Sequence, residues 1–349
     1  MSGRNKNLIL ILCRQGAERF LRKRDTSMKK IALASAALLL TGAASAAINP
    51  IPTTNGFSGA LSIGVASSDV SSNMYKGDDN GRINHLGAPD SHGETDPLLM
   101  LDLRYTLADS RTQFVLGNQV HDALRLDYTQ QLGVRQEIGN NGIVSAGLVF
   151  SGFGSKDVWA NPYALGTERE ETKRKSTGMR LGWEGILGSN FSADITRRKV
   201  ELDEERSPSS LLDRNGNTTR FNLSYDWEFA PGHFLAPGIV LGKHDLDGRA
   251  MSNDSAGFKL DYGYNTGLYT LTANLYLGEQ KYDAGNPLFG FKKADSSDFV
   301  IGANLLRHQL FGYKNVSGFV NAAYGKSDSD INFYDAEVKR VGAGVMYKF

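Results

Sequence analysis

The chain ends on the stretch Val341-Gly342-Ala343-Gly344-Val345-Met346-Tyr347-Lys348-Phe349, and this stretch decides the fold. Every odd position carries an apolar or aromatic residue, and the last residue is a phenylalanine. Alternation with a period of two predicts a β-strand with one face in an apolar environment and the other in a polar one. Bacterial outer-membrane β-barrels end on strands of this kind, because one face of the strand contacts lipid. The terminal stretch therefore predicts a membrane-spanning barrel.

Three other segments alternate in the same way. They are 99–107 and 220–229, with a leucine or an aromatic residue at each odd position, and 258–265, with one at each even position. A soluble β-sandwich shows the same period, because one face of each strand is buried there too. These segments, however, extend for about ten residues, which is the length of a tilted bilayer-crossing strand, whereas soluble strands usually have about five or six.

Fourteen segments are predicted strands, and an even count suits a bacterial barrel. They are 57–67, 97–107, 111–120, 123–138, 143–154, 176–187, 190–202, 218–229, 233–243, 255–265, 268–278, 296–306, 315–326 and 335–349. The connections are mostly long and short in turn, although 121–122 and 307–314 break this pattern and Pro237 interrupts a strand. We predict an all-β fold, a transmembrane antiparallel up-and-down β-barrel of fourteen strands, with twelve or sixteen strands as the alternatives.

The amino-terminal segment has the organisation of an export signal. Lys29 and Lys30 precede an apolar stretch at 31–40, and Ala44-Ser45-Ala46 supplies the small residues of a cleavage site. The apolar stretch has about half of the roughly 20 residues that a membrane-spanning helix needs. We predict that 28–46 is a signal peptide, that 1–27 is an upstream extension from a wrongly assigned start codon, and that 47–349 is one outer-membrane β-barrel domain.

Charge and hydropathy exclude two other classes of protein. The chain from Ala47 onward has 30 lysines and arginines against 36 aspartates and glutamates, a net charge of −6. It therefore lacks the basic footprint of a nucleic-acid-binding protein. Mean hydropathy is −0.33, and no segment of the predicted mature chain approaches eighteen consecutive apolar residues, which argues against helical membrane spans. Cys13 is the only cysteine, so the mature chain has no disulfide.

Aromatic residues gather beside the predicted short turns rather than beside the long loops. The group comprises Tyr105, Trp227, Phe229, Tyr262, Tyr264, Tyr347 and Phe349. Amphipathic rings favour the depth of the lipid headgroups, so we predict a membrane girdle on the periplasmic side. The alternative is the ordinary aromatic core of a β protein, which does not explain why these residues lie on one side.

Charged residues occupy the opposite parity of the predicted strands. The candidate pore-lining residues are Asp102, Arg104, Arg125, Asp127, Arg180, Glu184, Arg220, Asp226, Glu228, Lys259 and Asp261. Unpaired charges in a dry core carry a large desolvation cost, so the inner side of the barrel is either wet or densely cross-paired. Two interpretations stay open: these side chains line a passage and orient polar or zwitterionic solutes, or they form salt bridges that stiffen the barrel.

Other chemistry has little support in the sequence. Segments 77–81 and 327–330 have the oxygen-rich residues that suit Ca²⁺, but they lack the spacing of an EF-hand. The six histidines, including His244 beside Asp245 and Asp247, form no recognised catalytic or metal motif. A fatty-acid transporter of the hatch-bearing type would need a helical segment before its first strand, and 47–56 is too short. We predict no enzyme activity, no metal site and no cofactor.

Three short motifs connect the chain to a known family: Gly56-Phe57-Ser58-Gly59 in the first predicted strand, Ser72-Asn73-Met74 after it, and the terminal Tyr347-Lys348-Phe349. With these motifs the predicted mature chain resembles an uncharacterised family of Gram-negative outer-membrane β-barrel proteins, a domain of unknown function, and its design is similar to that of porins. The resemblance implies an outer-membrane location and a barrel, and it implies no substrate.

The expected function is a porin-like channel for the passive diffusion of small hydrophilic solutes across the bacterial outer membrane. The alternative is a non-conducting barrel with an adhesion, receptor or structural role through its external loops. Expected partners are outer-membrane lipid and lipopolysaccharide, the small solutes, and the barrel-assembly machinery, which would recognise the carboxy-terminal strand. No nucleic-acid partner is expected.

Overall fold

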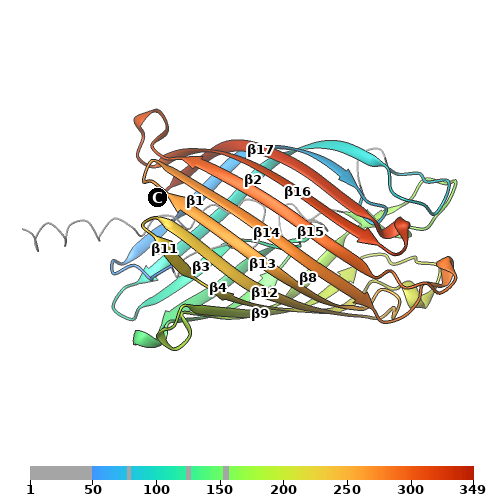
Figure 1. Ribbon diagram of the computed structural model, residues 1–349, viewed down its shortest axis with the longest axis horizontal. Helices are drawn as coiled ribbons and strands as arrows, with labels where there is room; N and C mark the ends of the chain where they lie inside the picture. The colour runs from blue at the N-terminus through green and yellow to red at the C-terminus, as the bar shows by residue number, and fades with distance from the viewer. Residues whose placement is uncertain (1–48, 77–79, 123–126, 152–156) are drawn as a thin grey trace, which may run out of the picture. The chain divides into compact units, whose positions relative to one another are not determined.

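The computed structural model describes residues 49–76, 80–122, 127–151 and 157–349. These residues belong to one compact unit, in which the strands run obliquely around a barrel (Figure 1). The predicted upstream extension 1–27 and signal peptide 28–46 lie outside the described residues. Within the described residues, none of the helices has the length and apolar character needed to span a bilayer.

The described secondary structure is almost entirely antiparallel sheet. The barrel strands are β1 (Gly56–Ser71), β2 (Ser91–Leu107), β3 (Thr112–Asp122), β4 (Asp127–Glu137), β5 (Ile143–Phe150), β8 (Arg174–Glu184), β9 (Phe191–Leu202), β10 (Gly216–Tyr225), β11 (Trp227–Ala230), β12 (His233–Leu246), β13 (Asn253–Asn265), β14 (Tyr269–Tyr282), β15 (Ser296–Arg307), β16 (Val316–Ser329) and β17 (Ala336–Lys348). A small separate hairpin consists of β6 (Val158–Trp159) and β7 (Glu171–Thr172). Single 3-10 turns lie at Gly139–Asn141, Ile186–Gly188, Ser210–Leu212, Pro287–Phe289, Leu310–Gly312 and Asn332–Tyr334.

The main sheet closes on itself into a ring, although β11 pairs with β12 alone and β2 pairs with β3 only over Asp102–Leu107. β1 pairs with β17, each strand pairs with its neighbours around the barrel, and β10 pairs with β12 to complete the ring. β10 and β11 both pair with β12 and together form one wall strand. The structure is thus a closed antiparallel barrel of fourteen strands, which confirms the predicted fold class and strand count.

Pro237 explains why one wall strand is divided. On one side of the break, Ser224 of β10 pairs with Gly238 of β12. On the other side, Trp227 of β11 pairs with Leu235 of β12. Pro237 lies between these two pairs and has no N–H with which to continue the ladder. On the opposite side, toward β9, the backbone N–H of Asp226 donates to the carbonyl of Asn190, 2.8 Å away. The proline therefore leaves a local gap in a continuous wall.

Side chains alternate between the two faces of the wall. In β1, Leu61, Ile63 and Val65 are exposed on the outer face, whereas Ala60 and Ala66 are buried on the inner face. β15 alternates in the same way along its whole length. An outer face covered by exposed leucine, isoleucine, valine and phenylalanine is costly in water and is stable in hydrocarbon.

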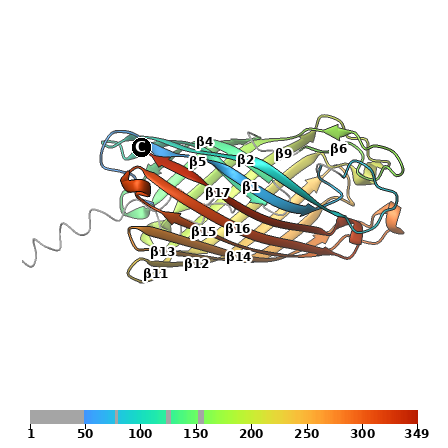
Figure 2. The same ribbon diagram turned by 90° about the horizontal axis from the view of Figure 1, so that it is seen from above.

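The two ends of the barrel differ. The turn end carries the short connections, such as 108–111 and 231–232, together with Phe349, whose backbone exchanges hydrogen bonds with Gly59 at 3.0 and 3.1 Å. The loop end carries the long connections, such as 203–215 and 283–295. Figure 2 shows the carboxyl terminus at the turn end and the hairpin strand β6 at the loop end.

Candidate functional site

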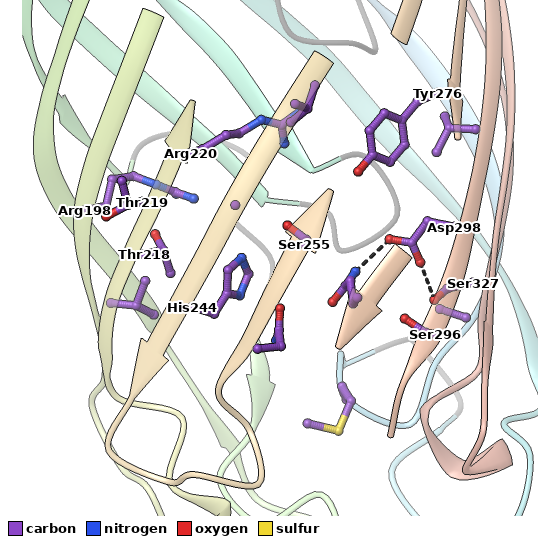
Figure 3. A pocket seen from close by; sticks show the side chains of 18 of the residues that line it. Arg198, Thr218, Thr219, Arg220, His244, Ser255, Tyr276, Ser296, Asp298 and Ser327 are labelled. Carbon is purple, nitrogen blue, oxygen red and sulfur yellow. Dashed lines mark hydrogen bonds between the residues drawn. The ribbon is translucent and has the colours of Figure 1, made fainter. Parts of the chain in front are cut away.

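The upper lumen, just beneath the loop end, encloses a cavity of about 360 Å³. Its lining comes from strands β3, β8 to β10 and β12 to β17 and from loop residues that include Met74, Arg214 and Met251. Figure 3 shows Arg198 and Arg220 on one side of the cavity. A cavity of this size is in the usual range for small-molecule sites, about 300–1,000 Å³.

One wall of the cavity carries cationic and hydroxyl groups. Arg198 in β9 lies opposite Thr218 in β10, and Arg220 lies opposite Thr196, so the two arginines are diagonal neighbours on the inner face. The guanidinium of Arg198 donates to Ser176 Oγ at 3.3 Å. Both arginines line the cavity.

The facing wall carries a carboxylate that the protein itself holds. Asp298 in β15 accepts hydrogen bonds from Gln280 Nε2 at 2.7 Å and from Ser327 Oγ at 2.6 Å. Figure 3 shows Asp298 and Ser327 across the cavity from the arginines. The cavity is therefore polarised across its width, with guanidinium groups on one side and a fixed carboxylate on the other.

Below this level, charged side chains cross-pair on the inner face. Arg180 Nε lies 3.1 Å from Asp194 Oδ1, and Lys259 Nζ lies 3.5 Å from Asp261 Oδ2. Asn222 donates a further hydrogen bond to Asp194 at 3.1 Å. Arg180, Asp194, Lys259 and Asp261 all line the cavity, so these ion pairs also contribute polar surface to the lumen.

At the turn end, Arg135 in β4 organises a polar cluster on the inner face. Its guanidinium contacts Glu184 Oε2 at 2.8 Å, Gln113 Oε1 at 2.8 Å and the carbonyl of Asn49 at 2.7 Å. Ile51, two residues after Asn49, is 1% exposed. The segment ahead of β1 is thus held against the inner face of the barrel at the turn end.

The other predicted lumen residues have varied surroundings. Asp102 and Arg104 form a two-bond ion pair with both distances at 2.9 Å, and Asp226 accepts from Ser192 Oγ at 2.9 Å. Glu228 lies at the exposed turn end, where it accepts from the Gly232 backbone at 3.3 Å. The surroundings of two predicted lumen residues are not described, because Arg125 and the side chain of Asp127 lie outside the described part of the chain.

Sequence reasoning did not select Arg135 or Arg198. Both have the parity that turns a side chain inward in their strands, since Arg135 follows Gln131 and Gly133 at intervals of two and Arg198 follows Asp194 and Thr196. Strand parity applied to every position, rather than to the clearest strands only, would have found them.

The predicted girdle aromatics lie around the outside of the turn end. Tyr105, Trp227, Phe229, Tyr347 and Phe349 are each between 37% and 49% exposed. Tyr262 and Tyr264 are partly covered, because Tyr262 Oη lies 2.9 Å from His233 Nδ1 and Tyr264 stacks on the His233 ring at 4.1 Å.

At the loop end, the long connections pack into a hydrophobic core of their own, here called the loop lid. Its buried residues are Tyr163, Leu212, Ala250, Met251, Ala294, Ile331 and Phe333, with Met74, Ile83, Leu86, Leu211, Leu246, Tyr282, Phe289 and Tyr334 packed around them. Among the described residues, these side chains come from six different loops and the adjoining strand ends. Met74, Met251, Ala294 and Tyr334 also line the cavity, so the loop lid is its ceiling.

Polar contacts fasten the loop lid from within. The hydroxyl groups of Tyr163 and Tyr334 lie 2.6 Å apart, and Asn286 Nδ2 donates to Tyr334 Oη at 2.5 Å. Burial raises the pKa of both tyrosines above the ordinary value, so both stay neutral donors. Burial also acts to raise the pKa of Glu205, but hydrogen bonds and charge from Arg214, 2.8 Å away, hold that pKa below its usual value.

Arg169 ties two loops of the loop lid together. Its guanidinium donates to the carbonyls of Asn73 at 3.0 Å, of Pro162 at 3.1 Å and of Asn80. The guanidinium carbon Cζ lies 4.6 Å from the centre of the Trp159 ring. Burial lowers the pKa of Arg169 to about 10, so it remains cationic at neutral pH. Removing it would leave buried carbonyl groups without their donor.

The histidine beside two aspartates does not form an assembled dyad. His244 lines the cavity, whereas Asp245 and Asp247 are exposed. No group of three or more histidine, cysteine or acidic side chains comes close enough to hold a metal ion in the parts of the chain that the structure describes.

Comparisons with known proteins add a family. The chain is similar to three solved structures: the CymD monoaromatic hydrocarbon channel (9% identity, 85% of this chain and 89% of that chain, TM-score 0.45), a Pseudomonas aeruginosa FadL homologue (12%, 90% and 96%, TM-score 0.43) and OmpT, an outer membrane protein of Vibrio cholerae (11%, 84% and 97%, TM-score 0.39). No curated protein matches the sequence. The model of the family described as "Protein of unknown function (DUF2860)" matches residues 56–348, and the chain belongs to this family.

Proposed function

We propose that this protein is an outer-membrane channel that lets small hydrophilic solutes diffuse through its lumen. The observation that supports this most is the polar cavity inside a closed barrel whose outer face is apolar. An apolar outer face suits lipid. Charged inner side chains with a cavity between them suit water and polar solutes, because desolvating them without such a phase is costly.

The loop lid sets the expected type of channel. Its buried core covers the cavity from the loop end, so an unobstructed, general pore is not expected. The solute passes only when the lid contacts separate, and the cavity limits its size. Rare or brief openings of small conductance are the expected behaviour.

Planar-bilayer recording tests the proposal. Refolded protein should give stepwise openings, and Phe333→Ala should increase the time spent open, because it removes a ring that is 1% exposed in the core of the loop lid. A buried phenylalanine truncated to alanine costs about 3–5 kcal/mol, here confined to the loop lid. Phe311→Ala is the matched control, since Phe311 is 86% exposed at the turn end.

The second candidate is a non-conducting barrel whose loops bind a surface or a receptor. The loop lid favours it, because loops with a buried core of their own present a fixed outer surface. Silence of folded wild-type protein and of folded Phe333→Ala alike would rule out the channel and support this alternative.

Location and further partners belong to the same proposal. An apolar outer face with aromatic residues beside the turn end fits the outer membrane and its lipids, including lipopolysaccharide on the loop side. The carboxy-terminal strand is the proposed recognition element for the barrel-assembly machinery.

A further inference from the structure

We infer that the cavity beneath the loop lid binds a neutral, polyhydroxylated solute of the size of a monosaccharide. Its hydroxyl groups bind Asn253 and Ser296, and its apolar face packs on Tyr276. The inference rests on the proposed channel, since it names the class of solute that the same cavity takes.

The charged side chains of the cavity lining are already engaged by the protein, which favours a neutral ligand. Asp298 accepts hydrogen bonds from Gln280 and Ser327. The cations among the described lining residues all have partners too: Arg180 with Asp194, Lys259 with Asp261, Arg214 with Glu205, and likewise Arg174, Arg198 and Arg220. An ionic ligand would have to displace such contacts and leave a buried charge unpaired, whereas a neutral ligand leaves them in place.

Two buried side chains of the lining, in contrast, have a polar atom without a hydrogen-bond partner among the described residues. The atoms are Asn253 Oδ1 in β13 and Ser296 Oγ in β15, on residues that are 4% and 7% exposed. A buried polar atom that makes no hydrogen bond is costly. Both atoms can accept a hydrogen bond, so a ligand that satisfies them must donate, as a hydroxyl group does.

The two side chains lie on either side of β14, which lets one ligand reach both. Asn253 is opposite Tyr282 of β14, and Ser296 is opposite Gln280 of the same strand. The backbones of β13 and β15 are therefore two strand spacings apart, about 10 Å. A hexose in front of β14, with hydroxyl groups around its ring, spans this distance together with the two side chains.

Further hydroxyl groups surround the same space. Thr218, Thr219 and Ser255 lie around the cavity together with Ser296 (Figure 3). A hydroxyl side chain both donates and accepts, and so does each hydroxyl group of a sugar. The lining can therefore exchange hydrogen bonds with a polyol in either direction.

An aromatic ring supplies the apolar part of the site. The Tyr276 ring lies over Gly257 and Gly278, where an added Cβ would come within 2.5 and 2.4 Å of the ring or its hydroxyl. The absence of side chains at both glycines lets the ring lie against the wall. The C–H face of a sugar ring packs on such a surface while its hydroxyl groups point to the polar rim. The cavity volume of about 360 Å³ sets the size at that of a monosaccharide.

Calorimetric titration of the folded protein, in a detergent without a sugar headgroup, tests the inference. D-glucose, D-galactose and D-mannose are the neutral probes, and the uronate of each is its charged counterpart. We expect at least one hexose to bind, and its uronate to bind at least about tenfold more weakly, because the carboxylate finds no free cation. Binding of none of the three hexoses, or equal binding of hexose and uronate, would overturn the inference.

Ser296→Ala and Asn253→Leu locate the site. Each should weaken hexose binding about tenfold, as expected for the loss of a hydrogen bond to the ligand. Since Ser296 Oγ has no partner among the described residues, Ser296→Ala should leave the unfolding temperature of the free protein unchanged or higher, whereas a structural hydroxyl would lower it.

Ser297→Ala is the matched control. Ser297 is the next residue of β15 and is exposed on the outer face, so its substitution should leave hexose binding unchanged. Unchanged binding by Ser296→Ala, or an equal loss in Ser297→Ala, would refute the site. Because binding is measured without current, a silent protein that still binds a hexose would refute only the channel, and a conducting protein that binds none would refute only the sugar site.

Discussion

Tyr276 occupies its place on the wall because two of its neighbours, Gly257 on β13 and Gly278 two residues further along β14, have no side chains. Gly278→Ala would add a Cβ 2.4 Å from the Tyr276 hydroxyl, so the ring must swing into the cavity or the wall must distort. Overpacking of this kind costs about 1–3 kcal/mol. We expect Gly278→Ala to lower the single-channel conductance while the barrel still folds, as measured in planar bilayers.

Gly93→Ala is the control for this substitution. Gly93 lies in β2, and an added Cβ there would meet no atom within 4 Å. A conductance that falls equally in both variants would mean that Tyr276 does not limit the passage.

Single residues also illustrate what the sequence could predict. Strand parity assigned Arg220 and Lys259 to the inner face, and both line the cavity. It did not indicate which charges pair, because Arg180 and Asp194 lie on different strands and their contact depends on the register of β8 with β9. Register depends on the geometry of the connecting turn as well as on the alternation of each strand.

The loop lid is the element on which the proposed gating depends. Tyr163→Phe removes the hydroxyl that lies 2.6 Å from Tyr334 Oη, and the loss of one buried hydrogen bond destabilises by about 1 kcal/mol. We expect faster proteolytic cleavage of the loops and longer openings. Tyr313→Phe, at an exposed position of the turn end, should change neither the rate of loop cleavage nor the length of the openings.

The ion pair between Glu205 and Arg214 makes the stability of the loop lid depend on pH. The pKa of Glu205 is lowered in the folded state, so the opened state binds more protons as the pH falls. The stabilisation is therefore complete above the ordinary glutamate pKa of 4.5 and is lost as the pH falls below it toward the lowered value. Loop proteolysis should accelerate across this range with an acid-stable protease.

Glu205→Gln separates this effect from general acid damage. The variant should be cleaved faster than the wild type at neutral pH and should lack the part of the acid dependence that Glu205 supplies. If both proteins show the same acid profile, another carboxylate controls the loop lid.

The strands were more predictable than the loops. Each predicted strand overlaps an observed one, because alternation is local and about ten residues are enough to reveal it. The loop lid was not predicted, since Tyr163, Leu212 and Phe333 come from polar segments far apart in the sequence and meet only when the barrel brings six loops together.

The closed barrel predicts that the protein resists unfolding by detergent at room temperature. The ring of wall strands is closed by the pairs of β1 with β17 and of β10 with β12, so detergent at room temperature meets few free strand edges at which unfolding could begin. Unboiled protein should migrate differently from boiled protein in a detergent gel. Identical migration of the two samples from membranes would contradict a folded barrel.

The meeting of Phe349 with Gly59 has a consequence for how the chain is connected. Because the two ends of the wall exchange hydrogen bonds at 3.0 and 3.1 Å, a short peptide joining them and a new break in the turn at 266–268 would give a circular permutant with the same ring of strands. Such a chain would finish on Asn265 instead of phenylalanine. If the barrel-assembly machinery recognises the terminal phenylalanine, we expect the permutant to refold in micelles but not to be inserted into the outer membrane of living cells.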